Sequence, residues 1–125
     1  MARSTERSKR KYTGKKYRRA HKKRKRDLTR APIETFIGKE KKKKQRTWGG
    51  NEKLKLFATN TINVTDPTTH KTQQTKILDF EENKATKDLN RRHILTKGAI
   101  VDTELGKVKI TSRPGQHGVL NGILI

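Results

Sequence analysis

From residue 51 onward, apolar and polar residues alternate with a period of two in several short stretches. In "NEKLKLFA" the leucines and the last alanine fall on one side and the lysines on the other, and "KILDF" alternates through Leu78 and Phe80. This period is typical of a strand with one face turned toward a core. Alternation or a short apolar run predicts strands within residues 51–58, 61–65, 76–80, 99–102, 106–110 and 118–125.

Turn-forming sequences separate these stretches, among them "DPTTH", "KG", "ELG" and "RPGQHG". Twelve threonines follow residue 46, and β-branched residues favour the pleated surface of a sheet over a helix interior. Only residues 82–93, "ENKATKDLNRRH", predict a helical turn. About six short strands joined by tight turns predict an all-β fold, a small closed β-barrel.

The N-terminal part of the chain lacks this alternation. Residues 1–30 carry cations at every helical phase, so the sequence predicts no amphipathic helix there. Spaced apolar residues first occur in "APIETFIG", residues 31–38. Within it, Ile33, Phe36 and Ile37 are candidates to anchor this extension to the domain.

Charge and apolar content divide the chain at about residue 46. Residues 1–46 contain 21 Lys and Arg against 4 Asp and Glu, whereas residues 47–125 contain 12 against 8. Only 10 of the 35 apolar residues precede residue 47. A segment with so little to bury cannot offset its ordering entropy. We therefore predict a basic extension at 1–46, disordered when free, and a β-barrel domain at 47–125.

The overall charge points to a polyanionic partner. The formal net charge is +21 and the sequence pI about 10.7, values typical of a domain that binds nucleic acid. A solvated tail, a localisation signal or a membrane-surface patch are the competing interpretations. A solvated tail usually mixes its charges, and the sequence contains neither an acylation site nor an amphipathic helix.

Other features of the sequence indicate where the protein resides. It has no cysteine, so disulfides and thiolate metal sites are excluded, which agrees with a reducing cytoplasm. Its N-terminus has no apolar region typical of a secretory signal, and no run approaches the roughly 18–20 apolar residues of a membrane span. We expect a soluble, cytoplasmic protein without a membrane partner.

The sequence offers no catalytic arrangement. Four histidines are scattered without metal-ligand spacing. Two acidic pairs, Glu81–Glu82 and Asp102–Glu104, have no nucleophile or base beside them in the pattern. We therefore expect no enzyme, no cofactor, no metal site and no small-molecule substrate.

The stretch "KKKKQRTWGGN", residues 41–51, joins the basic extension to the first alternating segment. Its lysines are suited to tracking phosphates, and Gly49–Gly50 permit a sharp turn and a close backbone approach. Trp48 has two interpretations: it stacks on a base, or it caps the end of the barrel. A second turn, "SRPGQHG", offers Arg113 as a phosphate ligand before a tight turn at Pro114–Gly115.

RNA is favoured over DNA because no recognition helix with base-reading residues is predicted. A disordered cationic arm on a β-barrel is suited to threading between RNA helices and folding as it binds. A DNA-compacting, nucleoid-type basic protein remains the alternative. The candidate RNA-binding residues are Arg3, Arg7, Lys9, Arg10, Lys11, Lys15, Lys16, Arg18, Arg19, Lys22, Lys23, Arg24, Lys25, Arg26, Arg30, Lys41, Lys42, Lys43, Lys44, Arg46, Trp48, Gly49, Gly50, Asn51, Lys53, Arg91, Arg92, Lys97 and Arg113.

Three stretches, taken together, carry a family resemblance. They are "RSKRKYTGKK…KKRKRDLTRAPIETFIG", "RTWGGNEKLK" and "HILTKGAIVDTELGKVKITSRPGQHGVLNGIL", and they resemble the archaeal and eukaryotic ribosomal protein S8e family in order over nearly the whole chain. The length is similar to that of the short archaeal form. The resemblance implies a β-barrel with a basic extension, a structural role in the small ribosomal subunit, and binding to 16S ribosomal RNA beside neighbouring ribosomal proteins.

Overall fold

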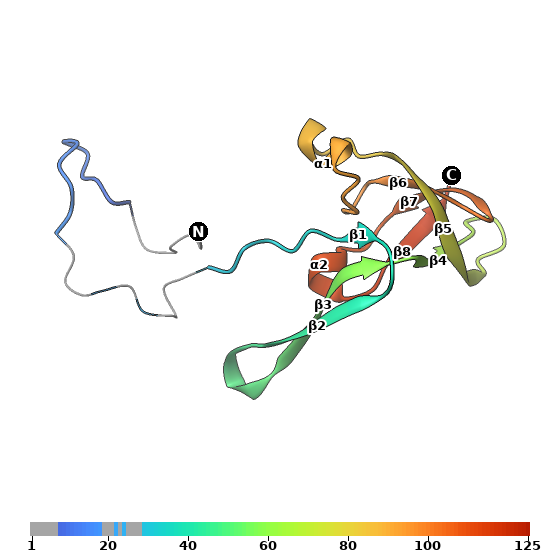
Figure 1. The fold of residues 1–125 in the computed structure, drawn as a ribbon, viewed down its shortest axis with the longest axis horizontal. Coiled ribbons are helices and arrows are strands. Elements are labelled where there is room, and N and C mark those ends of the chain that lie inside the picture. Colours follow the sequence, from blue (N-terminus) through green and yellow to red (C-terminus); the bar gives the residue numbers. More distant parts are fainter. Residues whose placement is uncertain (1–7, 19–21, 23, 25–28) are drawn as a thin grey trace. The chain divides into compact units, whose positions relative to one another are not determined.

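The computed structural model describes residues 8–18, 22, 24 and 29–125 (Figure 1). The chain divides into two compact units, Met1–Pro32 and Ile33–Ile125. Strands are the main regular secondary structure of the second unit, as the alternating pattern predicts. Within the described ranges, no helix is long and apolar enough to cross a membrane.

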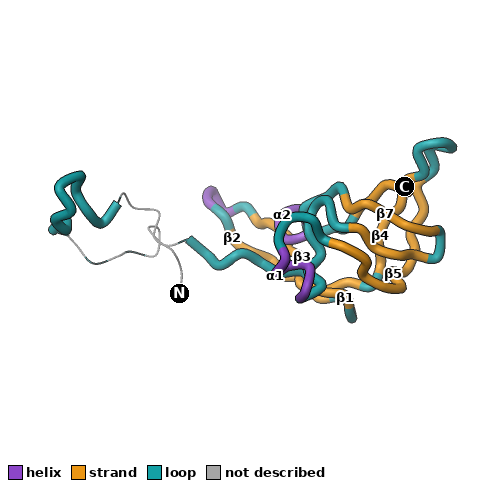
Figure 2. The backbone as a smooth tube through the Cα atoms, turned by 90° about the horizontal axis from the view of Figure 1, so that it is seen from above, coloured by secondary structure: helices purple, strands orange, loops and turns teal. Residues whose placement is uncertain are grey.

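Five strands of the second unit close into a barrel (Figures 1 and 2). Neighbouring strands run antiparallel except at the closure, where the first and last strands pair in parallel. In barrel order they are β4 (Thr61–Thr65), β5 (Thr72–Glu82), β6 (Ile100–Thr103), β7 (Gly106–Ile110) and β8 (Asn121–Leu124). The prediction of a small closed all-β barrel is confirmed, with five strands in place of about six.

The remaining predicted strand, β3 (Glu52–Thr59), belongs to a separate three-stranded sheet. It lies between β1 (Phe36–Ile37), which is parallel to it, and β2 (Lys41–Arg46), which is antiparallel. A short 3₁₀ helix, η2 (Trp48–Gly50), joins β2 to β3, and Figure 1 shows this hairpin extending away from the barrel. The sequence "KKKKQR" of β2 has no apolar position, so alternation gave no sign of a strand there.

The core fills the barrel. One prediction from the alternating pattern, the orientation of residues in β5, is wrong. We predicted Leu78 and Phe80 on the same face of β5, whereas Phe80 is buried and Leu78 is 64% exposed. A bulge between Ile77 and Asp79 shifts the register against β6, so Ile77 and Phe80 both face the core. The core side chains are Leu56, Ile62, Val64, Ile77, Phe80, Leu95, Ala99, Val101, Val108, Ile110 and Leu120.

The connection from β5 to β6 contains the predicted helical turn, α1 (Lys87–Arg91). Its N-cap is Thr86, whose Oγ1 accepts a hydrogen bond from the Leu89 N–H at 3.2 Å. Asn83 is buried beneath it and donates from Nδ2 to the Ile94 carbonyl and to Thr96 Oγ1, both at 2.9 Å. These bonds fix a connection that has few apolar residues of its own.

Residues 33–37 fasten the N-terminal side of the second unit. Thr35 is buried; its Oγ1 donates to the Leu56 carbonyl at 2.8 Å, and its own carbonyl accepts from the Leu95 N–H at 2.8 Å. Ile37 packs against the barrel core, as expected of an anchor. Ile33 is half-buried, and its carbonyl oxygen lies 3.0 Å from where a Cβ on Gly115 would be.

The compact unit therefore begins at Ile33, whereas charge and apolar content place the boundary at residue 46. The difference comes from β2, which is an exposed, lysine-rich edge strand held by backbone hydrogen bonds instead of apolar burial. Composition cannot distinguish such a strand from a solvated tail. Disorder of the free extension stays a prediction.

A second short helix, α2 (Pro114–His117), replaces the tight turn predicted at Pro114–Gly115. Proline at its first position and left-handed Gly118 after its last (φ +75°) are the expected start and stop signals. Gly118 lies against β3, since a Cβ there would be 2.8 Å from Leu54 Cβ. Helix α2 thus packs beside the base of the β2–β3 hairpin.

In the first unit, the described residues 8–18 form a tight turn. Arg10 and Lys16 make an isolated antiparallel bridge, and the Lys11 N–H donates to the Lys15 carbonyl at 2.8 Å. Gly14 takes φ +81° at the turn. The ammonium group of Lys11 lies 5.6 Å from the centre of the Tyr17 ring.

Candidate nucleic-acid interface

Positive charge within the second unit is concentrated on the β2–β3 hairpin and the residues before it. Residues 39–55 hold eight Lys and Arg against two acids, a net charge of +6. The rest of the unit, residues 33–38 and 56–125, holds ten against eight, a net charge of +2. Seventeen residues of this unit thus carry most of its excess charge, on an element that projects from the barrel (Figure 1).

Strand pairing sorts these cations onto two faces of the hairpin. On one face Lys43 lies opposite Lys55, and Gln45 lies opposite Lys53. The other face carries Lys42, Lys44 and Arg46 opposite Leu56, Leu54 and Glu52, respectively. The leucine face is the one toward α2, because Leu54 contacts Gly118 and Leu56 is buried.

The face with Lys43, Lys53 and Lys55, which we call the lysine face, carries no neutralising partner. Among the described residues, no ion pair involves any of these three lysines, whereas Lys42 pairs with Glu40 and Lys44 lies 4.0 Å from Glu52. Like charges directly opposite each other on a sheet destabilise it. The isolated protein therefore holds an unfavourable arrangement that a polyanion would relieve.

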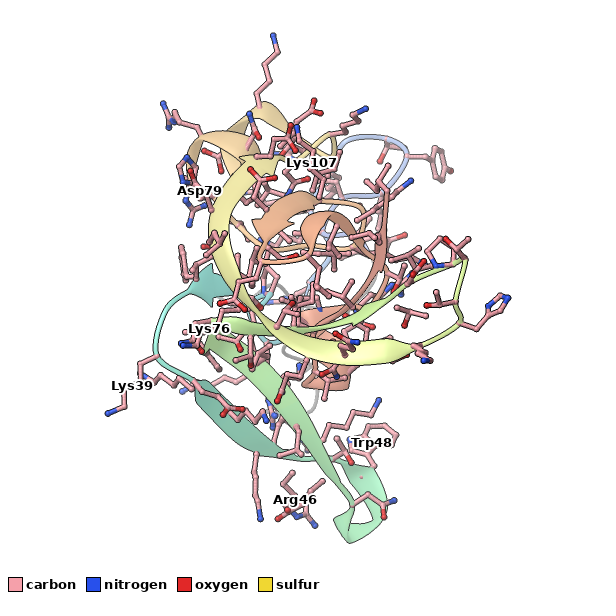
Figure 3. All side chains as sticks on the ribbon, turned by 90° about the vertical axis from the view of Figure 1, so that its right-hand side faces the viewer. Lys39, Arg46, Trp48, Lys76, Asp79 and Lys107 are labelled. Atoms are coloured by element: carbon pink, nitrogen blue, oxygen red, sulfur yellow. The ribbon has the colours of Figure 1, made fainter. Side chains whose placement is uncertain are left out.

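The tip of the hairpin is a closed five-residue loop. The Thr47 N–H donates to the Asn51 carbonyl at 2.7 Å, and Gly49 and Gly50 take φ +73° and +77°. Trp48 is 86% exposed, so the interpretation in which it caps the barrel is wrong. Figure 3 shows Trp48 and Arg46 together at this tip, far from Asp79 and Lys107 on the barrel.

Helix α2 adds a cation near the hairpin base. Arg113 is exposed and precedes α2, and its backbone N–H donates to His117 Nδ1 at 3.2 Å. Because α2 packs on β3, Arg113 belongs to the same side of the unit as the hairpin. The sequence offered Arg113 only as a phosphate ligand in a separate turn, and its place beside the hairpin follows from the packing of α2 on β3.

The structure does not bring the other barrel candidates to the hairpin. Figure 1 shows α1, with Arg91, on the opposite side of the unit from the hairpin tip. Arg92, which follows α1, bonds Glu34 and also Asp88 at 3.2 Å, and the Glu34 hydrogen bond raises its guanidinium pKa. Its charge is therefore already compensated. Lys97 is exposed in the turn before β6.

The strands β5, β6 and β7 carry four acids and three lysines, so they have no excess of positive charge. Asp79 lies opposite Asp102, and Glu81 binds Lys107 in an ion pair. The Glu81 hydrogen bond raises the pKa of the Lys107 ammonium group. The hairpin side, with its net charge of +6, is therefore the better candidate for a nucleic-acid interface within this unit.

In the first unit, the described candidates are exposed cations; they are Lys9, Arg10, Lys11, Lys15, Lys16, Arg18, Lys22, Arg24 and Arg30. The candidates Arg3, Arg7, Arg19, Lys23, Lys25 and Arg26 lie outside the described residues. Lys55 was missed by the sequence reasoning. The alternation that puts Lys53 and Lys55 on one face of their strand was the signal that could have found it.

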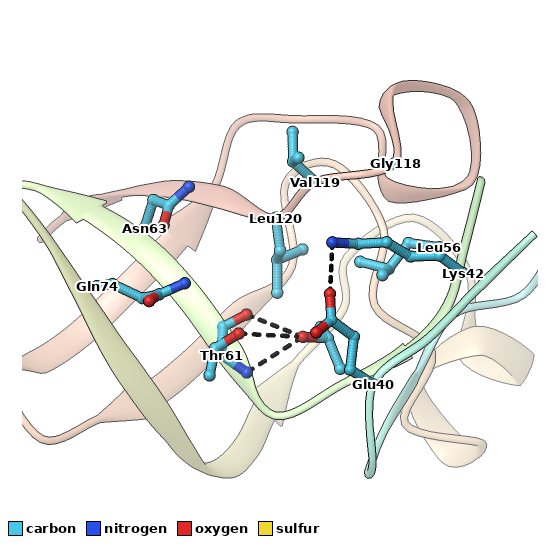
Figure 4. A pocket seen from close by; sticks show the side chains of 10 residues that line it. Glu40, Lys42, Leu56, Thr61, Asn63, Gln74, Gly118, Val119 and Leu120 are labelled. Carbon is cyan, nitrogen blue, oxygen red and sulfur yellow. Dashed lines mark hydrogen bonds and ion pairs between the residues drawn. The ribbon is translucent and has the colours of Figure 1, made fainter. Parts of the chain in front are cut away.

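A small pocket lies where the hairpin base meets the barrel (Figure 4). Its volume is about 90 Å³, and its lining includes the Glu40–Lys42 ion pair, Thr61, Gln74 and Leu120. Ligand pockets are usually about 300–1,000 Å³. No group of three or more His, Asp or Glu that could hold a metal occurs in the part of the chain that the structure describes.

Comparison with known proteins points to one family. Residues 4–125 match the family model described as ribosomal protein S8e. The chain is 56% identical to the small ribosomal subunit protein eS8 of Nanoarchaeum equitans over 113 residues, which are 90% of this chain and 89% of that protein. It is 55% identical to the eS8 protein of Methanobrevibacter smithii over 103 residues, 82% of each chain, and 46% identical to that of Methanospirillum hungatei over 119 residues, 95% of each.

Proposed function

The chain belongs to the ribosomal protein S8e family, and from this we propose that it is a structural constituent of the small ribosomal subunit that binds 16S ribosomal RNA. Its relatives are ribosomal proteins, not enzymes, in keeping with the absence of a catalytic pattern from the sequence. Its partners would be the ribosomal RNA and neighbouring proteins of the small subunit, in the cytoplasm.

The observation that carries this proposal is the lysine face. Lys43 and Lys55 are paired across two strands with no acid to neutralise them, on a hairpin that leaves the barrel. Each phosphate that approaches this face replaces a repulsion with a charge-assisted hydrogen bond. Binding also releases counterions condensed on the RNA, which adds to its free energy.

The two parts of the chain would then have different tasks. The extension with Lys9, Arg10 and Lys11 would follow the RNA backbone, where phosphate contacts position a protein without reading sequence. The hairpin is held by the β1–β3–β2 sheet, so it would present its cations in a fixed geometry. The barrel would serve as the support that carries the hairpin.

Sedimentation in a sucrose gradient tests the proposal with the full chain. We expect the protein to travel with small ribosomal subunits, and a variant with Lys43, Lys53 and Lys55 changed to Gln to be partly displaced as salt is raised. The matched control changes Lys71, Lys76 and Lys109 to Gln, three exposed lysines outside the hairpin. Its sedimentation should equal that of the unchanged protein.

Two outcomes would contradict the proposal. One is sedimentation of the protein with DNA instead of subunits, as a nucleoid-type protein would show. The other is equal displacement of the hairpin variant and its control, which would mean that binding depends on total charge and not on the lysine face.

A further inference from the structure

Trp48 is the single tryptophan of the chain, and the fold leaves it almost unburied. Its side chain is 86% exposed at the tip of the β2–β3 hairpin. Within the described residues, neither an aromatic ring nor a cation stacks on the indole. Both faces of a large aromatic group are therefore available to a partner, and the core gains nothing from it.

Hydrogen bonds hold the backbone of the loop around Trp48. Thr47 closes it with two hydrogen bonds to the Asn51 carbonyl, from N–H at 2.7 Å and from Oγ1 at 3.0 Å. The Asn51 side-chain amide donates back to the Trp48 carbonyl at 3.4 Å. Because the loop is closed by its own hydrogen bonds, binding through Trp48 requires little further ordering of the backbone.

The two residues after Trp48 keep the tip open. Both are glycines with positive φ, and a Cβ on Gly50 would meet no atom within 4 Å. No side chain at these two positions can cover the indole. A flat ligand can therefore approach along the loop backbone.

Cations surround this aromatic group. Arg46 ends β2 next to the loop, Lys53 lies two residues after the loop, and Lys44 lies three residues before it. Glu52 is the one acid of the tip, and it lies opposite Arg46. The tip thus combines an exposed π-face with positive charge on both strands. That combination is typical of proteins that stack on nucleic-acid bases and contact the flanking phosphates.

We propose that Trp48 stacks on an unpaired base of an RNA, while Arg46 and Lys53 contact the phosphates beside it. This inference rests on the proposed RNA-binding function and names the structural class of RNA that the hairpin tip selects. A base inside a duplex already stacks on its neighbours, so the indole requires a loop, bulge or strand end where a base is free. An apolar protein partner would bury the indole equally well, but it would leave the surrounding cations unpaired.

Fluorescence of the full-length protein tests the proposal directly, because all tryptophan emission comes from Trp48. Three probes are titrated: a short single-stranded RNA, a fully paired RNA duplex with the same number of phosphates, and inorganic polyphosphate. Single-stranded RNA should quench the emission strongly and the duplex weakly. Polyphosphate should bind without quenching, since it has no base.

Substitutions at the same position separate stacking from simple apolar contact. Trp48→Leu should weaken binding of single-stranded RNA by about 5- to 150-fold, the range expected for one stacked base. Trp48→Phe, which keeps an aromatic ring, should recover most of that loss. Neither variant should change the affinity for polyphosphate.

Failure of the stacking proposal and failure of the proposed RNA-binding function would give different results. If the protein binds RNA but polyphosphate quenches as strongly as single-stranded RNA, or if Trp48→Leu binds as tightly as Trp48→Phe, the stacking proposal is overturned and RNA binding stands. If the unchanged protein binds neither RNA nor polyphosphate, the proposed function itself fails.

Discussion

Gly122 and Gly50 are glycines for two different physical reasons. At Gly122 in β8, a Cβ would lie 2.4 Å from Val108 Cγ1 and 3.0 Å from the Lys109 carbonyl oxygen, so the barrel interior has no room for it. At Gly50 the space is open, but φ is +77°, a region that costs an L-residue roughly 1–2 kcal/mol. Sterics decide the first case and backbone strain the second.

Alanine at each position should therefore destabilise the protein by a different route. We expect Gly122→Ala to lower the free energy of unfolding by about 1–3 kcal/mol through overpacking. Gly50→Ala should cost about 1 kcal/mol, and Gly50→Asn less, because asparagine enters the left-handed region more easily. Urea denaturation of the full chain measures all three. A Gly122→Ala protein as stable as the unchanged one would show that the barrel core has more room than the structure gives it.

Asn83 is a buried polar residue whose side-chain amide forms hydrogen bonds through both its nitrogen and its oxygen. Besides its two Nδ2 donations, its Oδ1 accepts from the Ala85 N–H at 3.0 Å, and its own N–H donates to Asn90 Oδ1 at 2.8 Å. Asn83→Ala leaves buried partners such as the Ile94 carbonyl unpaired, so we predict a loss of about 1–3 kcal/mol in unfolding free energy. Exposed Gln73→Ala is the control and should change little. Equal denaturation midpoints for both variants would contradict this role.

At the scale of elements, alternation predicted the barrel strands because each has one face in the core. It failed at β5, where "KILDF" offers apolar residues at three of five positions. The pattern alone could not show that a bulge buries Ile77 and Phe80 and exposes Leu78. It also missed β2, whose backbone pairing leaves no trace in a run of lysines. Both failures come from hydrogen-bond register, which depends on the partner strand.

The like charges on the β2–β3 hairpin should lower the stability of the free protein while they strengthen RNA binding. Lys55→Thr removes the like charge opposite Lys43, so we expect the free protein to gain about 0.2–1 kcal/mol in unfolding free energy. Lys53→Thr is the matched control, because it removes the same charge but lies opposite Gln45. Both changes should weaken RNA binding. Thermal melts that show equal gains for the two variants would mean that the cross-strand repulsion is too well screened to matter.

At the scale of the whole molecule, composition divides the chain at about residue 46, whereas the compact units meet at Pro32 and Ile33. Thr35 is buried and hydrogen-bonded to Leu56 and Leu95, although it lies before the basic run Lys41–Arg46. The candidate site was predictable as a set of cations. Its division into the lysine face and the leucine face was not, because that division follows from pairing Lys43 with Lys55 across the hairpin.

Limited trypsin digestion distinguishes between a domain boundary at Ile33 and one at residue 46. If the compact unit begins at Ile33, the resistant fragment should start just after Arg30, with β2 protected by its pairing to β3. The boundary taken from charge instead predicts rapid cleavage within Lys41–Arg46 and a fragment starting near Trp48. Mass spectrometry of the early products decides between them. Cleavage within β2 as fast as at Arg30 would show that the hairpin opens in the free protein.

The salt dependence of RNA binding should show how the two units share the phosphate contacts. Residues 1–32 hold 15 of the 33 Lys and Arg, and residues 39–55 hold eight. Log affinity falls linearly with log salt by about 0.7–0.9 per phosphate neutralised. We therefore expect the unchanged full chain to have a steeper dependence of log affinity on log salt than variants that lack some of these cations. Changing Lys9, Lys11, Lys15 and Lys16 to Gln, or Lys41 to Lys44 to Gln, should lower it by up to about 3–4 in each case.

Filter-binding titrations of ribosomal RNA at several salt concentrations measure these slopes. Circular dichroism is the control for folding, and it should not change, because exposed lysines contribute little to the core. The two sets lie in different units, so their effects on the slope should add when they are combined. If the variant in the first unit kept the full slope while the hairpin variant lost it, those four lysines of the extension would make no phosphate contact. Recognition would then depend chiefly on the hairpin, where strand pairing already sets the positions of the lysines on the lysine face.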